Sequence, residues 1–264
     1  MNISNFHTHT YLCKHATGKP IDYVEQANKE GCLELGFSDH CPYDKSFTDT
    51  WPNVRMAPEE VPLYISEVEQ AKQIAKYPVH LGFECEYDKN YESWYHDELK
   101  GKYKAEYLVL GSHWVTKGSS HIYCVDIDNK DDLNKYIDQT IDGMNSGLFA
   151  FLAHPDLFMK GYKEWDNESK SCLMAILDAA VDLQMPIEVN GLGMSRTPNE
   201  TTHGIRYQYP YREFWEIVAQ KNVPVICNAD AHDPLDVIFN AQKARDFASR
   251  YNIKPIDTLA AFKK

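Results

Sequence analysis

The chain has 264 residues, of which 43% are hydrophobic and 25% charged, a composition ordinary for a globular protein with a buried core. Its net charge of −12 and the lack of a basic stripe exclude a typical nucleic-acid binder, and the lack of an apolar run of about 18 residues excludes a transmembrane helix. The start shows no signal-peptide pattern and the seven cysteines stand alone, so we expect a cytoplasmic protein with free, buried thiols.

Short apolar runs alternate with helix-like stretches along the whole chain. The runs predict seven strands, at 3–6, 33–38, 79–83, 107–111, 149–153, 187–189 and 223–229. The stretches between them predict helices near 20–30, 58–76, 129–145, 168–184, 210–221 and 234–251. Nearly continuous apolar strands between helices favour an α/β fold with a parallel sheet buried on both faces. Seven strands favour a closed barrel, with an open doubly wound sheet as the alternative.

One segment, 41–57, breaks this alternation. It is rich in proline, aspartate and tryptophan and is predicted to be a long loop. Long loops often form lids or binding surfaces, and a passive surface excursion is the competing interpretation.

Polar side chains that can bind metal stand at the end of almost every predicted strand. In a parallel barrel these ends open on one face, where active sites are built. A single His-x-His or Asp-x-His pair would carry little weight, but seven of the eleven histidines occupy such positions. The residues at the strand ends are His7, His9, His15, Asp39, His40, Glu84, His113, His154, Asn190, Asp230 and His232.

The number and type of these groups predict several metal ions. One ion takes four to six ligands, so these side chains exceed the needs of a single site. Mixed imidazole and carboxylate ligands suit Zn, Mn or Fe better than Mg or Ca. Glu84 could bridge two ions, an arrangement that activates water and clamps a phosphoryl group.

Six motifs in the same order resemble the PHP (polymerase and histidinol phosphatase) superfamily, and most closely its monofunctional histidinol-phosphatases. They span nearly the whole chain: Phe6-His7-Thr8-His9, Gly36-Phe37-Ser38-Asp39-His40-Cys41-Pro42, Gly82-Phe83-Glu84, Gly111-Ser112-His113, Ala153-His154-Pro155-Asp156-Leu157 and Asp230-Ala231-His232.

The resemblance implies that residues 1–264 form a single domain, a distorted seven-stranded β/α (TIM-like) barrel of the PHP fold. It also implies three divalent metal ions (Zn, Mn or Fe). The implied ligands are His7, His9, Glu84 and Asp230 for the first ion, Glu84, His113 and His154 for the second, and His15, His40 and His232 for the third.

The resemblance further implies hydrolysis of L-histidinol phosphate to L-histidinol and phosphate, a reaction of histidine biosynthesis. The basic residues that would face the phosphate are Lys160 and Arg196. In the hypothesis that follows, water activated by the metals attacks phosphorus, and Asp230 or His232 helps the leaving group. Glu84, Asp230, His232 and Arg196 would then be catalytic. The candidates for an amine or imidazole pocket are Glu86, Trp114, Asp156, Arg206 and Tyr209.

Other functions share some of these features. A PHP-type phosphotyrosine phosphatase or a general small-molecule phosphoesterase would use the same metals and differ in substrate profile. A metal-dependent amidohydrolase also carries His-x-His on its first strand, but Glu84 and the histidine of Asp230-Ala231-His232 argue against it. A metal-storing protein would turn over no phosphate ester. We expect a small phosphorylated substrate and neither nucleic acid nor membrane as partner; the oligomeric state is left open.

Overall fold

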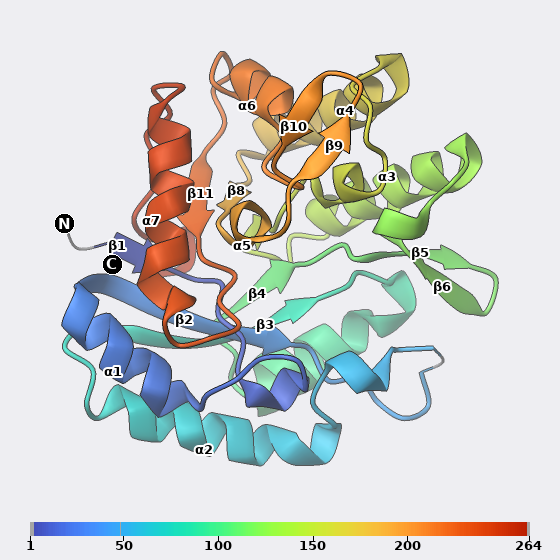
Figure 1. The fold of residues 1–264 in the computed structure, drawn as a ribbon. Helices are drawn as coiled ribbons and strands as arrows, with labels where there is room; N and C mark the ends of the chain where they lie inside the picture. Colours follow the sequence, from blue (N-terminus) through green and yellow to red (C-terminus); the bar gives the residue numbers. More distant parts are fainter. Residues whose placement is uncertain (1–2, 48, 263–264) are drawn as a thin grey trace.

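The computed structural model describes residues 3–47 and 49–262. Seven strands form one sheet in which every paired neighbour is parallel. Its order is β1-β2-β3-β4-β7-β8-β11, which follows the chain, and helices cover its outer face (Figure 1). The strands are β1 (Ile3–Asn5), β2 (Cys32–His40), β3 (Val79–Cys85), β4 (Tyr107–Leu110), β7 (Phe151–Leu152), β8 (Ile187–Asn190) and β11 (Val225–Asn228).

The two edges of this sheet meet just beyond the ends of β1 and β11. His9 N donates to Ala231 O (2.9 Å) and Ala231 N donates to His7 O (3.1 Å), so a short parallel bridge joins the first and last motifs. The predicted seven-stranded β/α barrel is therefore confirmed, and the open doubly wound alternative is wrong. Parallel pairing also brings the carboxyl ends of all seven strands to one mouth.

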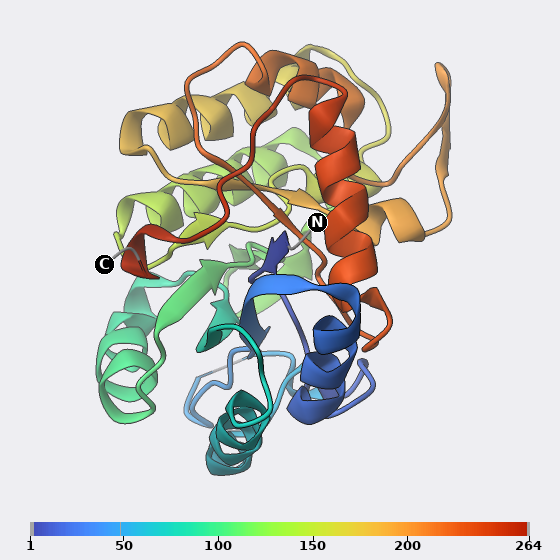
Figure 2. The same cartoon turned by 90° about the vertical axis from the view of Figure 1, so that its left-hand side faces the viewer.

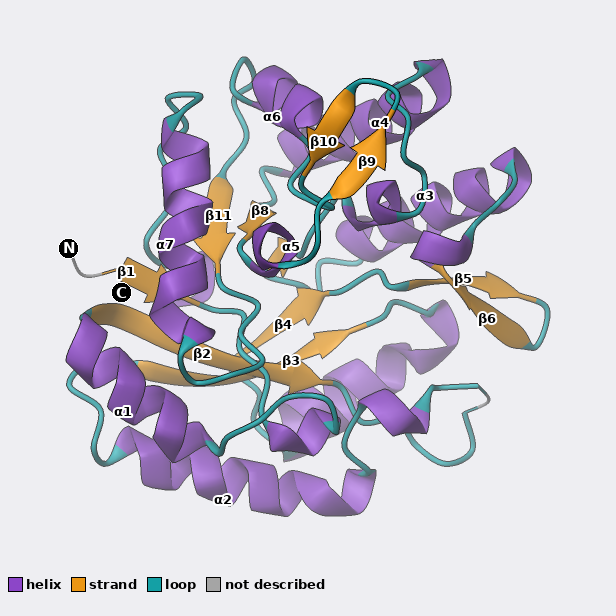
Figure 3. Ribbon diagram, viewed as in Figure 1, coloured by secondary structure: helices purple, strands orange, loops and turns teal. Residues whose placement is uncertain are grey.

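Helices lie around the barrel, as Figures 2 and 3 show. α1 packs on α2, α3 packs on α4, and α7 lies against β1, β8 and β11. None of the described helices is long and apolar enough to span a lipid bilayer. The helices are α1 (Pro20–Glu30), α2 (Val61–Lys72), α3 (Lys130–Asn145), α4 (Asn167–Leu183), α5 (Leu192–Ser195), α6 (Arg212–Val218) and α7 (Asp236–Ser249).

Tyr107 of β4 fills the barrel interior. Its hydroxyl donates to Phe6 O (2.9 Å), and its ring lies over the backbone of β2 and β3. A Cβ on Gly36 would come within 2.2 Å of the Tyr107 hydroxyl, so this position accepts no side chain without rearrangement. Leu259 and Phe262 pack against the same small core from the C-terminal segment. The end of the barrel opposite the mouth is thereby sealed.

The predicted strands and helices are confirmed, with their limits shifted by a few residues. The predicted helix 58–76 begins as a 3-10 turn (Pro58–Glu60) and continues as α2. The predicted loop 41–57 contains one 3-10 turn (Pro52–Val54), and residue 48 lies outside the described part. Apart from short 3-10 turns, the unpredicted elements of the described chain are a π-helix (Trp94–Lys102), the helix α5, and two hairpins. The hairpins pair β5 (Trp114–Lys117) with β6 (Ser120–Tyr123) and β9 (Asn199–Thr201) with β10 (Gly204–Arg206).

Candidate metal centre

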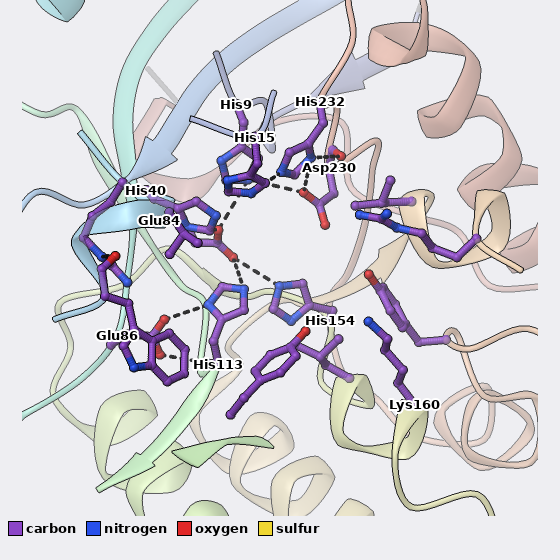
Figure 4. A pocket seen from close by; sticks show the side chains of 18 residues that line it. His9, His15, His40, Glu84, Glu86, His113, His154, Lys160, Asp230 and His232 are labelled. Carbon is purple, nitrogen blue, oxygen red and sulfur yellow. Dashed lines mark hydrogen bonds and ion pairs between the residues drawn. The ribbon is translucent and has the colours of Figure 1, made fainter. Parts of the chain in front are cut away.

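A cavity of about 400 Å³ opens at the carboxyl ends of the strands. Figure 4 shows imidazole rings and carboxylates from different strands pointing into it. Eight of the nine predicted metal ligands line this cavity, and His7 lies fully buried directly beneath it, 3.3 Å from Glu84. The lining ligands are His9, His15, His40, Glu84, His113, His154, Asp230 and His232.

Glu84 occupies the centre of this cluster. The register of β2 and β3 pairs it with His40, whose Nδ1 lies 3.1 Å from Glu84 Oε2. Four further rings approach its two oxygens within 3.6 Å, although the carboxylate is only 1% exposed. These rings belong to His7 (3.3 Å), His9 (3.4 Å), His113 (3.6 Å) and His154 (3.1 Å).

His7 presents a lone pair to two carboxylates. Its Nδ1 donates to Glu188 Oε1 (2.9 Å), which leaves Nε2 unprotonated in the neutral ring. Nε2 has no hydrogen-bond partner among the described residues, yet it lies 3.3 Å from Glu84 Oε1 and 3.5 Å from Asp230 Oδ1. Acceptors this close need a proton or a cation between them. A divalent ion fits this position.

A second pair of facing lone pairs lies at His15 and His232. The Nδ1 of each ring donates to a backbone carbonyl, that of Cys13 (2.8 Å) and that of Asp230 (3.0 Å). A carbonyl can only accept, so both Nε2 atoms are acceptors in neutral rings, and they lie 3.1 Å apart. The ring of His40 stacks on that of His15 at 5.3 Å between centroids. These three rings therefore also fit a cation.

His113 repeats the arrangement at the end of β4. Its Nδ1 donates to Glu86 Oε1 (2.7 Å), so Nε2 faces Glu84 Oε1 at 3.6 Å, and the ring of His154 lies 4.9 Å away. Gly111 makes room for this ring, because a Cβ there would lie 2.7 Å from it. Carboxylate–imidazole pairs such as Glu86–His113 are typical of metal-ligating histidines.

Burial and neighbouring charge divide the histidines into two groups. Burial opposes the charged form of His9, but hydrogen bonds to Asp230 and Asp39 outweigh it and raise its pKa to about 9. Burial is also outweighed at His7 and His113, where nearby negative charges raise the pKa, mainly that of Glu188 for His7 and that of Glu84 for His113. Burial, reinforced by the charge on His9, instead lowers the pKa of His15 and His40, and that of His232 to about 3. Without metal, protons thus occupy the Glu84–Asp230 side of the cluster, and the His15–His232 side is neutral.

Two of the predicted ligands have unusual backbone angles. His154 and Asp230 adopt φ values of +27° and +51°, a region that costs a non-glycine residue roughly 1–3 kcal/mol. Each follows the end of its strand by two residues. The backbone turns sharply there and directs the side chain into the mouth of the barrel.

Three cations line the same cavity. Lys160 and Arg196, the two predicted phosphate-binding residues, both do so. Arg196 makes no ion pair among the described residues, and Lys160 Nζ lies 5.8 Å from the centroid of Tyr123. Arg55 is the third. Its guanidinium donates to Cys41 O (3.0 Å) and lies over Trp114.

The predicted amine or imidazole pocket is only partly assembled. Glu86 and Tyr209 line the cavity, but the other three candidates do not. Asp156 is buried and accepts from Tyr211 N (2.5 Å) and Trp215 Nε1 (3.1 Å), so it joins two segments instead. Trp114 packs between Arg55 and His121, and Arg206 donates to backbone carbonyls elsewhere. For these three the pocket interpretation is wrong.

Some residues beside the cluster were missed as part of the site. Glu188, fully buried in β8, binds His7 Nδ1 and His154 N and accepts from Asn228. Its place inside an apolar strand was a signal, because a buried carboxylate needs partners. Cys13 is buried as predicted, with all seven cysteines free, but its thiol also lies within 4.8 Å of His15 and His232 ligand atoms.

Comparison with protein families agrees with this geometry. The model of the PHP domain matches residues 5–191. Among relatives, a protein of Deinococcus radiodurans named probable histidinol-phosphatase is 26% identical and matches over 92% of this chain and 93% of its own length. The histidinol-phosphatase of Bacillus subtilis (strain 168) is 25% identical, over 88% and 94%.

Among solved structures, a histidinol phosphate phosphatase from Lactococcus lactis has the same fold. Its TM-score is 0.74 at 17% sequence identity, and the alignment covers 99% of this chain and 98% of that one. That crystal structure is of a complex with zinc, L-histidinol and phosphate.

Proposed function

The chain belongs to the PHP domain family, and from this premise we propose that it is a metal-dependent phosphatase that hydrolyses L-histidinol phosphate to L-histidinol and phosphate. The observation that carries the proposal is the set of facing lone pairs around Glu84 and between His15 and His232, in a cavity that cations also line. The names of the relatives and the ligands of the Lactococcus lactis enzyme supply the substrate.

The residues that would hold three divalent ions are those predicted from the sequence. His7, His9, Glu84 and Asp230 would hold the first, Glu84, His113 and His154 the second, and His15, His40 and His232 the third. When bound, such ions supply Lewis-acid stabilisation of phosphoryl charge and lower the pKa of water. Imidazole with carboxylate suits zinc, manganese or iron. Glu188, Glu86 and Asp39 would orient the rings, since they lie against His7, His113 and His9.

We propose that Arg196 and Lys160 bind the phosphate group of the substrate. The guanidinium of Arg196 can donate two parallel hydrogen bonds to phosphate oxygens, whereas Lys160 offers a point charge. Both would offset charge that grows on the phosphoryl oxygens as the ester bond breaks. Glu86 and Tyr209, which line the same cavity, would contact the organic part of the substrate.

The departing alkoxide oxygen needs a proton, and Asp230 and His232 are the two candidates. Burial raises the pKa of Asp230, but His7 and His9 outweigh it and hold that pKa well below its usual range. Burial and the charge on His9 lower the pKa of His232 to about 3. Neither carries a proton at neutral pH. His232 would hold an ion through Nε2, its only lone pair, so Asp230, which has a second carboxylate oxygen, would be the group that accepts a proton from the attacking water and then donates it to the alkoxide.

Three further statements belong to this proposal. Residues 1–264 act as one domain, because the first and last strands close the same barrel. The substrate is a small phosphate ester and not a nucleic acid, as the net charge of −12 suggests. The protein works in the cytoplasm, where seven free cysteines stay reduced.

The test is phosphate release by zinc- or manganese-loaded protein from L-histidinol phosphate, tyrosine phosphate, p-nitrophenyl phosphate and a phosphodiester. We expect kcat/KM of about 10⁴ M⁻¹s⁻¹ or more on L-histidinol phosphate, well above the other three. Preference for tyrosine phosphate would instead favour the phosphotyrosine phosphatase, and equal slow rates on all monoesters a general phosphoesterase. No release from any of them would contradict phosphatase activity.

A further inference from the structure

A second cavity of about 400 Å³ lies behind the hairpin of β9 and β10, away from the metal centre. The hairpin projects from the barrel in Figure 2 and stands beside α6 in Figure 1. The volume of the second cavity falls in the range of small-molecule sites, roughly 300–1,000 Å³. The other walls of this cavity come from the first turn of α6, which includes Glu213, and from the end of α7 and the residues after it, which include Phe247, Arg250 and Tyr251.

Positive charge gathers in this cavity, although the whole chain carries −12. Three arginines line it, Arg206, Arg212 and Arg250, and Glu213 is the only carboxylate among its described lining residues. Arg212 pairs with Glu213 at 3.2 Å, but within the described chain neither Arg206 nor Arg250 has a carboxylate within 4.0 Å. Arg206 already donates from both terminal nitrogens to backbone carbonyls, so the guanidinium group left to bind a carboxylate or phosphate group is that of Arg250.

Aromatic rings line the same walls. Tyr207, Tyr211 and Tyr251 contribute to the lining together with Phe247. The guanidinium of Arg206 already lies over Tyr211, 4.4 Å from the ring centroid, and its Nε is buried without a hydrogen-bond partner in the described part of the chain. Rings and guanidinium planes both stack on planar groups. The side chains that line this cavity therefore favour a ligand with both a planar ring and a negative charge.

We propose that this second cavity binds a small organic anion that carries a planar ring, and that its occupation changes the affinity of the metal-centre cavity for phosphate esters. The first statement stands on the walls just described. The second rests on the proposed function, because it concerns the two residues assigned to the phosphate.

One segment connects the two cavities. Leu192, Arg196 and Tyr209 line the metal-centre cavity, whereas most residues from 198 to 211 line the second one. Lys160 is tied to the same hairpin, since Asn199 Nδ2 donates to Lys160 O (3.1 Å). Arg206 of the hairpin donates from Nη2 to the backbone before and after Lys160, at Met159 O (2.7 Å) and Lys163 O (3.2 Å). A ligand that moves the hairpin therefore acts directly on the backbone that carries Lys160, and through residues 197 and 198 on the backbone that carries Arg196.

The experiment follows the δ1-methyl signal of Ile205 in zinc-loaded, full-length protein with ¹³C-labelled isoleucine methyls. Ile205 is 75% exposed and lines the second cavity, and the variant Ile205→Val assigns its signal. Phenylphosphonate and indole-3-acetate are the ring-bearing anions, and neither contains a phosphate ester. Methylphosphonate and acetate are their ringless counterparts, and indole is the uncharged ring.

We expect a saturable shift with a Kd below about 1 mM for at least one ring-bearing anion. Whether it is the phosphonate or the carboxylate identifies the anionic group. Arg250→Glu should weaken binding at least tenfold, and Arg212→Gln should weaken it less. Lys29→Glu, a charge reversal on the exposed face of α1, should leave it unchanged.

Three results would overturn the site. One is no shift of the Ile205 signal up to about 5 mM. Another is an equal shift with methylphosphonate or acetate, which would mean an adventitious ion only. The third is an Ile205 signal that depends on protein concentration, with a dimer in sedimentation velocity that Arg250→Glu dissociates, since the cavity would then be a contact between two copies.

The coupling has its own readout. At saturation the anion should change KM for L-histidinol phosphate by about fivefold, with kcat little affected, and Arg250→Glu should remove the effect. Binding without any change in KM would overturn the coupling and leave the site intact. If the protein hydrolyses no phosphate ester, the proposed function fails, but the Ile205 signal still decides whether the site exists.

Discussion

Glu84 is the residue on which the metal cluster depends, because five imidazole rings surround its buried carboxylate. Glu84→Gln keeps the shape of the side chain but removes one oxygen ligand and the negative charge. We expect the variant to lose bound metal and to lose kcat/KM by more than about a hundredfold. Removal of a residue that only hydrogen-bonds to a metal ligand typically costs about 10- to 100-fold, so the loss of a ligand itself should exceed that range. Metal content by mass spectrometry and phosphate release measure the two losses; wild-type turnover would exclude a bridging role.

Arg196 allows a sharper test, because it lines the cavity without belonging to the metal cluster. Loss of a charge-assisted hydrogen bond costs about 1.5–3 kcal/mol, so Arg196→Ala should lower kcat/KM roughly 10- to 100-fold with metal content intact. Arg196→Lys keeps the positive charge but not the two parallel N–H donors of the guanidinium group, so it should recover part of the loss. Steady-state kinetics of both variants give the answer. Unchanged kinetics in Arg196→Ala would make this arginine a surface residue.

At the scale of the elements, the N-terminal cap of α4 allows the stability of the fold to be changed without a change in the active site. Asp166 caps α4: its Oδ1 accepts from Glu168 N and Ser169 N, both at 3.0 Å. Asp166→Ala should lower the free energy of unfolding by about 1 kcal/mol and leave metal content and kcat/KM unchanged. Asp178→Ala, an exposed aspartate on the same helix, is the matched control and should cost less than about 0.5 kcal/mol. Urea unfolding followed by circular dichroism measures both; equal losses would contradict the cap.

The elements also show how far a sequence can predict this fold. The seven strands were predictable because each is a short, nearly continuous apolar run, and six of the helices because helix-like stretches separate these runs. The hairpin of β9 and β10 was not, since its exposed residues form no such run. The role of Glu188 was missed for another reason: its partners His7 and Asn228 are distant in the chain. Whether the segment 41–57 closes as a lid stays a prediction, although Trp51, Val54 and Arg55 line the cavity wall.

At the scale of the whole molecule, pH should act in opposite directions with and without metal. The pKa of His9 is raised from 6.5 to about 9, so without metal this histidine stabilises the fold below pH 6.5, and that contribution is lost as pH rises through 9. A metal ion must displace the same proton, so zinc affinity should rise over the same interval. Tm should therefore fall between pH 6.5 and 9 in chelator-treated protein and rise in the presence of zinc.

Differential scanning fluorimetry across this interval, with and without zinc, measures both slopes. Calorimetric zinc titrations in two buffers of different ionisation enthalpy should also show proton release, greatest below pH 9. Parallel Tm curves with and without zinc would mean that His9 binds no metal.

The backbone bridge that joins His7 and His9 to Ala231 also sets an order of events during synthesis. The first two histidines leave the ribosome early, but Asp230 and His232 are made more than 200 residues later. Glu84 and its rings cannot form a closed cluster until then, because the last strand supplies both the missing ligands and the seam of the barrel. Metal uptake at full affinity therefore comes only after the last strand and its motif have been made and paired, and until then the nascent chain carries its first histidines exposed to whatever ions the surrounding solution offers.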